Sequence, residues 1–267
     1  MGSGLHEWAL VVFTVLAQSA VGAFTLLSLF LLTAQGKQQI ARTHYTMTAL
    51  WVLMAIGFTF STLHLGSPHR AFNALNRIGL SNLSNEIATG SAFFALGAGY
   101  WVIATLPHLP SKWQHIGFIA PFAKLSAKLT AWLPLLRILV ILVGFVFVYA
   151  MSALYRIPTV PTWNSIFTPV GFVLTAVVAG SALTACLLSS ANIGEQFRQS
   201  VLLLTLVGII ATAVATYFHY EYLATVNTAI HQALNLVPSY VPVMAVRFGL
   251  LLVGLVLLWR GVKAGWH

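Results

Sequence analysis

The chain has 267 residues, of which 59% are hydrophobic and 6% are charged, and its formal net charge at pH 7 is +9. A soluble domain usually carries about a quarter to a third charged residues on its surface, so this composition excludes an ordinary soluble domain. The 13 basic residues are scattered between apolar stretches and form no stripe that a phosphate backbone could follow, which argues against nucleic acid as a partner.

Seven apolar stretches are each close to the roughly 20 residues that a membrane-spanning helix needs. They cover residues 8–32, 45–63, 87–106, 132–154, 167–188, 201–220 and 241–259. No basic segment precedes the first stretch, so we expect a retained span and not a cleaved signal peptide. Small residues in AVGAF, GSAFFALGAG and VVAGSALTA predict faces where helices pack closely. We therefore predict an all-α, polytopic membrane bundle that forms one domain over residues 1–267.

The basic residues predict the orientation of this bundle. If the N-terminus lies outside, nine of the 13 basic residues fall on the inner side and three on the outer side, while Arg247 lies within the seventh stretch. Lysine and arginine accumulate in cytoplasmic loops, so this asymmetry predicts an outer N-terminus. The longest inner connection, residues 107–130, ends in a mildly amphipathic segment that we expect to lie along the membrane surface.

The connection between the second and third stretches, HLGSPHRAFNALNRIGLSNLSNE, is rich in ionisable residues. Glycine and proline after His64 predict that one helix ends there. The next helix is predicted to begin near Ser84 as N-cap, with Glu86 in its first turn. Each residue has an ordinary structural explanation, because a histidine suits the membrane interface and a carboxylate suits a helix start. We expect this connection to bring the outer ends of the two helices together.

Four residues of the connection form a candidate pocket, namely His64, Arg70, Arg77 and Glu86. Ionisable groups near membrane depth are costly and usually functional. A quinol releases two protons and two electrons when it is oxidised. His64 could accept one proton, since imidazole titrates near pH 6.5, and Glu86 could accept or relay the other. An arginine could stabilise negative charge on the ring.

Two alternatives belong to other functional classes. In a b-type cytochrome, His64 and His219 are the conceivable axial pair because both fall near outer span ends, but no histidine lies in the middle of a span. A small transporter usually has polar sites at the midplane, whereas the polar residues here gather at one end. The single cysteine, Cys186, argues against an iron–sulfur cluster or a structural zinc site in this chain.

Three further polar features lie outside the connection. Arg247, in the first part of the seventh stretch, either snorkels to the interface or contacts Glu221 or a quinone oxygen. Gln18 is predicted to make an interhelical hydrogen bond. The segment VPTWNSIFTPVGF, residues 160–172, is a turn with two prolines that leads into the fifth span, and its Trp163 could also cover a ring.

The segment LHLGSPHRAFNALNRIGLSNLSNEIATG, residues 63–90, closely resembles the membrane anchor subunit of bacterial anaerobic dimethyl sulfoxide reductase. The opening MGSGLHEW and the segment VPTWNSIFTPVGF resemble the same family. The resemblance implies an inner-membrane anchor that has no haem and no iron–sulfur cluster of its own. It also implies that the anchor oxidises menaquinol and binds an iron–sulfur subunit and a molybdopterin catalytic subunit.

The resemblance further implies that His64 and Glu86 take part in quinol binding. On this interpretation the protein is not an enzyme by itself but the quinol-oxidising subunit of an oxidoreductase. The sequence departs from the family in one respect. Eight spans are expected there, the last with a glutamate and an arginine, whereas this sequence shows seven and ends at WRGVKAGWH.

Overall fold

The computed structural model describes residues 8–63, 68–114, 116–117, 119–227, 232–236 and 239–264, with only the backbone given for 63, 68–71, 236 and 264. Seven helices in this part of the chain are long and apolar enough to cross a membrane, which confirms the predicted number of spans. They are α1 (Trp8–Phe30), α3 (Ile40–Leu63), α4 (Asn82–Thr105), α7 (Leu133–Tyr155), α8 (Phe167–Ser190), α9 (Glu195–Thr225) and α11 (Tyr240–Ala264).

Short helical segments connect the long helices. They are α2 (Ala34–Gln38), η2 (Pro68–Arg77), η3 (Leu106–His108), α5 (Ser111–Gln114), α6 (Ala120–Leu129), η4 (Thr130–Trp132) and α10 (Ala233–Leu236). The described residues contain no strand and only one isolated bridge, between Asn227 and Gln232. The predicted amphipathic segment is helix α6, and its buried Ser126 donates a hydrogen bond to the carbonyl of Ile103 on α4 at 2.6 Å.

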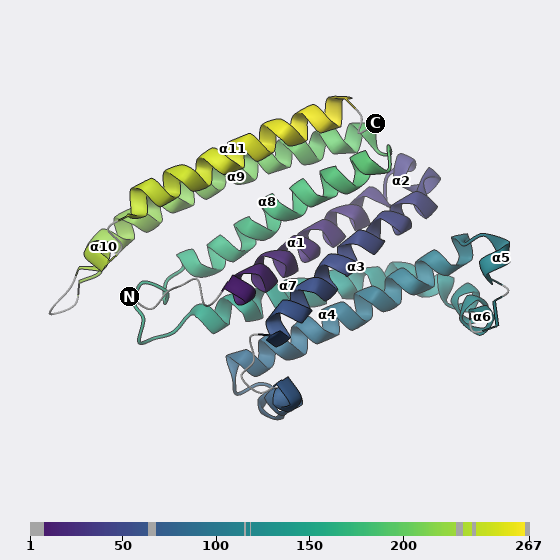
Figure 1. Cartoon of the computed structure of the whole chain (residues 1–267), viewed down its shortest axis with the longest axis horizontal. Helices are drawn as coiled ribbons and strands as arrows, with labels where there is room; N and C mark the ends of the chain where they lie inside the picture. Colours follow the sequence, from purple (N-terminus) through teal and green to yellow (C-terminus); the bar gives the residue numbers. More distant parts are fainter. Residues whose placement is uncertain are drawn as a thin grey trace.

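The long helices alternate in direction and lie side by side (Figure 1). We call the end where α1 begins the Trp8 end, and the opposite end the Lys37 end. Helices α1, α4, α8 and α11 start at the Trp8 end, whereas α3, α7 and α9 finish there. The connector η2 also lies at the Trp8 end, while α2, α5 and α6 lie at the Lys37 end (Figure 1). By the positive-inside rule, the Trp8 end is the predicted outer end.

Helix α1 lies at the centre of the bundle against α8, α3 and α7. Gly22 and Gly180 allow α1 and α8 to touch, because a Cβ atom on Gly180 would lie only 2.5 Å from the Cα of Gly22. These glycines stand in two of the small-residue segments that predict close packing, so those predicted faces are confirmed.

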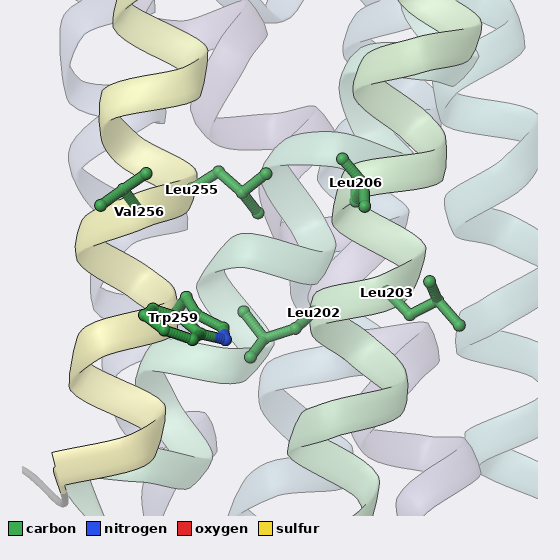
Figure 2. A pocket seen from close by; sticks show the side chains of 6 residues that line it. All are labelled: Leu202, Leu203, Leu206, Leu255, Val256 and Trp259. Atoms are coloured by element: carbon green, nitrogen blue, oxygen red, sulfur yellow. The ribbon is translucent and has the colours of Figure 1, made fainter.

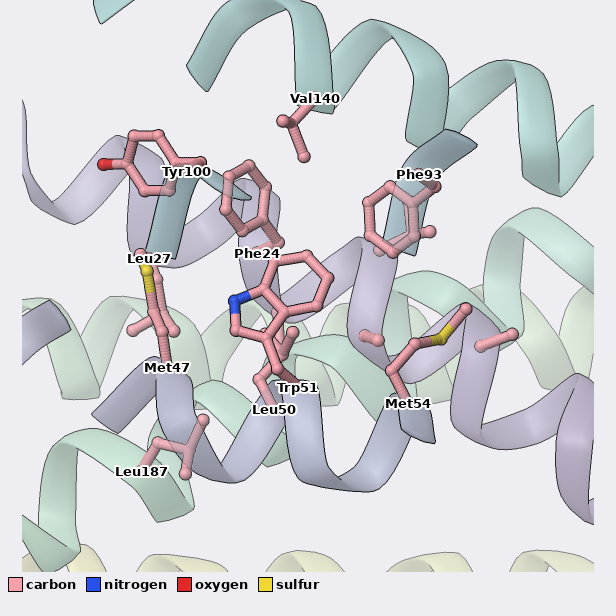
Figure 3. Close-up of a cluster of buried hydrophobic side chains, with 14 of the residues drawn as sticks. Phe24, Leu27, Met47, Leu50, Trp51, Met54, Phe93, Tyr100, Val140 and Leu187 are labelled. Atoms are coloured by element: carbon pink, nitrogen blue, oxygen red, sulfur yellow. The ribbon is translucent and has the colours of Figure 1, made fainter. Parts of the chain in front are cut away.

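An aromatic layer fills the interior between α1, α3, α4 and α7. It consists of Phe24, Trp51, Phe93 and Phe147, and three of these appear in Figure 3. The centroid of the Phe93 ring lies 5.5 Å from that of Trp51 and 6.1 Å from that of Phe147. Beyond this layer, towards the Lys37 end, His44 Nε2 lies 3.1 Å from the hydroxyl of Tyr100.

Helix α11 is the outermost helix and packs on α9 and α8. Most of its large apolar side chains are exposed, as expected for a face that contacts lipid. A shallow apolar cavity of about 330 Å³ lies between α9 and α11 (Figure 2). Its lining residues are Leu202, Leu203, Leu206, Leu255, Val256 and Trp259.

Helix α9 is longer at both ends than the predicted span of residues 201–220. It begins at Glu195, directly after Gly194, whose φ of 65° is the left-handed conformation that ends the preceding turn. The side-chain oxygen of Gln39 accepts a hydrogen bond from the amide of Gly194 at 3.2 Å. Hydropathy alone locates the apolar middle of this helix and not these polar turns at its ends.

Candidate functional site at the Trp8 end

The start of α4 differs from the prediction by one turn. The N-cap is Ser81 and not Ser84, since Ser81 has extended φ and ψ of −118° and 127° and its hydroxyl accepts from the amide of Ser84. The helix therefore begins at Asn82, and Glu86 lies in its second turn. The cause is a turn just upstream, where Gly79 has a φ of 87° and donates its amide to Oδ1 of Asn85 at 2.6 Å.

The motif SNLSNE, residues 81–86, also joins α4 to α7. The side-chain amide of Asn82 donates a hydrogen bond to the carbonyl of Ala153, near the end of α7, at 3.0 Å. Ser81, Asn82 and Asn85 therefore each have a structural partner that explains their presence. No such local hydrogen bond accounts for Oε1 of Glu86.

Glu86 is 3% exposed, and its Oε1 atom has no hydrogen-bond partner. It lies on the same face of α4 as Gly90 and Phe93, because residues three and four apart share a helix face. That face points into the bundle, since a Cβ atom on Gly90 would lie 2.7 Å from the Phe147 ring. A buried carboxylate without a partner is unfavourable by several kcal/mol when it is ionised, so this group needs a further explanation.

The other three residues of the candidate pocket are placed less completely. His64 lies outside the described residues. Arg70 lies within η2, where only its backbone is described, and Arg77 is exposed at the end of η2. Among the described residues, no hydrogen bond or ion pair joins Glu86 to Arg77, and Oε1 of Glu86 has no partner.

A groove runs along the start of α4 on the surface of the bundle. Its volume is about 440 Å³, and it lies between α4 and α7. Asn82, Asn85 and Thr89 contribute polar groups, while Tyr149, three alanines, one valine and one isoleucine make the rest of the wall mostly apolar. Glu86 does not line this groove itself, although Asn82 and Thr89, four residues before it and three after it, both do. The start of α4 therefore has a buried carboxylate and, beside it, an amphiphilic groove.

A second cavity at the Trp8 end contains residues that the sequence pointed to only weakly. Its volume is about 310 Å³, and its lining includes Gln18, Trp163 and Arg247. The hydrogen bond predicted for Gln18 is not made by its Oε1 atom, which is buried without a partner. Arg247 contacts Met244 and Phe248 and is not paired with Glu221 in the part of the chain that the structure describes.

His219 is enclosed by aromatic side chains at the same end. Its ring stacks on Phe167 at a centroid distance of 5.1 Å and on Tyr222 at 6.4 Å. The hydroxyl of Tyr222 donates to the carbonyl of Pro161 at 3.1 Å, which ties α9 to the segment of residues 160–172. His219 therefore helps to hold this segment in place.

Comparisons with known proteins agree with the resemblance seen in the motifs. A family model described as "DMSO reductase anchor subunit (DmsC)" matches residues 1–264. The C subunit of anaerobic dimethyl sulfoxide reductase from Escherichia coli (strain K12) is 42% identical over 263 residues, which cover 96% of this protein and 84% of that one.

Two more relatives have related names. The anaerobic dimethyl sulfoxide reductase subunit YnfH of Escherichia coli (strain K12) is 38% identical, and the match covers 96% of this protein and 83% of YnfH. The C subunit from Haemophilus influenzae is 37% identical, and the match covers 99% of this protein and 88% of that subunit. No solved structure matches this protein. The match over nearly the whole sequence, together with the seven apolar helices, shows that the protein belongs to the family of DMSO reductase membrane anchor subunits.

Proposed function

We propose that this anchor subunit oxidises menaquinol at the Trp8 end and passes the electrons to an iron–sulfur partner subunit. That partner would pass the electrons on to a molybdopterin subunit, which reduces the terminal acceptor. The observation that carries the proposal is the Glu86 carboxylate, which is buried and has no partner for Oε1, beside Ser81, Asn82 and Asn85, whose side chains have partners. The bundle would sit in the bacterial inner membrane with the Trp8 end facing the periplasm.

The proposed reaction balances with two proton acceptors. Menaquinol loses two protons and two electrons and becomes menaquinone. Glu86 would take one proton as a general base, and His64, just before η2, would take the other. Both electrons would leave to the iron–sulfur partner. Arg70 and Arg77, on the same connector, would favour negative charge on the ring as its protons depart.

The groove between α4 and α7 supports the binding of a quinol with a long apolar tail. Its volume of about 440 Å³ falls within the range of roughly 300–1,000 Å³ that is usual for small-molecule sites. Exposed Tyr149 lies on its wall, so the groove opens on the lipid-facing surface of the bundle. A tail could therefore remain in the bilayer while the ring approaches the start of α4.

The aromatic layer supports a one-sided release of protons. Phe93 lies on the same face of α4 as Glu86, and it packs against Trp51 and Phe147. The phenylalanine rings have no hydrogen-bonding group, and the indole N–H of Trp51 can donate but not accept, so this layer cannot relay a proton from Glu86 towards His44 at the Lys37 end. The protons would therefore return to the solvent at the Trp8 end, and the reaction by itself would not build a membrane potential.

The test is a substitution of Glu86 assayed with two electron donors. In the purified complex, Glu86→Gln keeps the shape of the side chain but cannot accept a proton. We expect menaquinol-dependent turnover to fall about 100-fold, which is the usual contribution of a general base. Turnover with a reduced soluble dye, which supplies electrons directly to the partner subunits, should stay at the wild-type level.

The matched control is Glu195→Gln. Glu195 is exposed at the start of α9, at the Lys37 end, so its replacement should leave both activities unchanged. Normal menaquinol oxidation by the assembled Glu86→Gln complex would contradict the proposal. A loss of both activities would show that Glu86 acts on assembly, and it would equally reject its role as a base.

A further inference from the structure

The second cavity at the Trp8 end is separate from the Glu86 site. It lies where α1, α8 and α11 meet the end of α7, and none of its lining residues belongs to α4. It is lined by Thr14, Val15, Gln18, Tyr155, Trp163, Thr168, Gly171, Phe172, Thr175 and Arg247. Val15, Trp163 and Arg247 are also exposed, so the cavity opens on the surface of the bundle.

Gln18 gives the cavity a hydrogen-bonding group that lacks a partner. The side chain is 3% exposed, and its Oε1 atom is buried with no hydrogen bond. Buried polar atoms are nearly always hydrogen-bonded, and one without a partner is destabilising. A ligand that donates a hydrogen bond to this oxygen would remove that cost. A hydroxyl group is well suited, because it could also accept from the amide nitrogen if Gln18 were rotated.

Arg247 gives the cavity a strong donor. It lies about 10 Å along α11 from the first residue of that helix, at 1.5 Å per residue. Its guanidinium contacts Met244 Sδ at 3.9 Å and lies 5.8 Å from the Phe248 ring, neither of which offsets its charge. A cation at this depth usually pairs with an acceptor or marks a ligand site. The ligand should therefore also carry an oxygen that accepts from Arg247.

Aromatic side chains line the space near these two groups. The ring of Tyr155 lies 6.0 Å from that of Trp163 and 5.4 Å from that of Phe172. These residues come from the end of α7, the segment of residues 160–172 and the start of α8. Flat aromatic surfaces favour a planar ring. The cavity volume of about 310 Å³ is at the small end of the usual range for such ligands.

We propose that this cavity is a second binding site for the dihydroxylated aromatic ring of a quinol, held between Gln18 and Arg247. One ring hydroxyl donates to Gln18, the oxygen of the other accepts from Arg247, and the tail leaves through the open side into lipid. The identity of the ligand rests on the proposed function, whereas the existence of the site rests on the cavity. A lipid headgroup fits less well, because it has no planar ring to lie against the aromatic side chains of the wall.

The test is photolabelling of the purified complex in lipid nanodiscs. The probe is an alkylquinolone with a diazirine at the start of its tail, because its ring N–H donates and its ring carbonyl accepts. Mass spectrometry would map the labelled peptides. We expect label on α1 and on residues 160–172, in addition to any label near the start of α4.

Two substitutions report on the site. Gln18→Leu and Arg247→Met should each reduce label on α1 and residues 160–172 about fivefold or more, the effect of one lost hydrogen bond. The matched controls are Gln199→Leu near the start of α9 and Arg260→Met near the end of α11, both at the Lys37 end. These controls should leave the label on α1 and residues 160–172 unchanged. Glu86→Gln should not affect label at this cavity. Thermal unfolding of each variant complex verifies that the fold is retained.

Several results would overturn the inference. Label confined to the start of α4, or label on α1 that persists in both Gln18→Leu and Arg247→Met, would show that the cavity does not hold the ring. Displacement of the label by phosphatidylglycerol but not by unlabelled naphthalenediol would identify a lipid headgroup as the occupant. Because labelling needs no turnover, an anchor that failed to oxidise menaquinol would refute the proposed function without affecting this result.

Discussion

At the start of α4, neighbouring polar side chains have different tasks. Ser81 caps the helix, Asn82 fastens it to α7, and Asn85 holds the turn at Gly79. Glu86 is buried beside them, and its Oε1 atom has no partner. These local bonds fix the helix start, so that Glu86 is held at one position and depth. A group that receives protons from a bound ring benefits from such a fixed position.

His64 allows a prediction at the same scale. We expect His64→Ala to leave the complex assembled and its turnover with a soluble dye unchanged. Menaquinol-dependent turnover should fall about 100-fold, because the second proton acceptor is lost. His108→Ala serves as the control, since His108 lies at the Lys37 end. Steady-state rates with the two donors are the measurement, and wild-type rates with menaquinol would refute a role for His64.

Sequence reasoning found the residues of this motif but not their register. The letters SNLSNE repeat serine and asparagine at a spacing of three, so both Ser81 and Ser84 suit an N-cap. What decides between them is the turn at Gly79 together with the bond from its amide to Asn85, and neither is visible in a hydropathy pattern. The sequence did not reveal the cavity around Gln18 for a related reason, because its walls combine α1 and α11, from opposite ends of the sequence, with α7 and α8.

At the scale of the helices, close contact between α1 and α8 holds the centre of the bundle. Gly180 packs directly on Gly22, and a Cβ atom at Gly180 would overlap the α1 backbone. Without a hydrophobic drive between helices in lipid, such close packing is a main source of association. The small-residue segments predicted that helices would pack at these faces. They did not reveal which pairs would meet, since the same kind of segment occurs in several spans.

This contact leads to a prediction about stability. Gly180→Val should lower the free energy of unfolding by about 1–3 kcal/mol, because the added side chain must push α1 and α8 apart. Gly254→Val on α11 is the matched control, since a Cβ atom there would meet nothing within 4 Å. Thermal unfolding of the two variants in detergent is the measurement. Equal melting temperatures for both variants would contradict the close α1–α8 contact.

At the scale of the whole molecule, the candidate groups for quinol chemistry gather at the Trp8 end. The Glu86 site and the Gln18 cavity both lie there, and the connector η2 projects from the same end (Figure 1). The connector and the turn after it carry apolar side chains that are unusually exposed, with Phe72 at 82% and Leu80 at 89%. Exposed apolar groups next to polar ones often mark a protein interface. We therefore expect the iron–sulfur partner to dock over this connector.

The predicted sidedness agrees with this arrangement. The Lys37 end carries most of the basic residues, which favours the cytoplasm for that end and the periplasm for the Trp8 end. An electron that leaves a quinol at the Trp8 end would have to cross the aromatic layer to reach a partner on the other side. A partner docked over η2 receives it directly.

The central claim is therefore that electrons leave the anchor at the Trp8 end, and site-specific photo-crosslinking in the assembled complex tests it most directly. A photoreactive amino acid would replace Leu80, after the connector, or Phe122 on α6 at the Lys37 end, both of which are exposed. The account predicts a crosslink from position 80 to the iron–sulfur subunit and none from position 122. A crosslink to that subunit from position 122 and none from position 80 would place the partner at the opposite end and contradict the account.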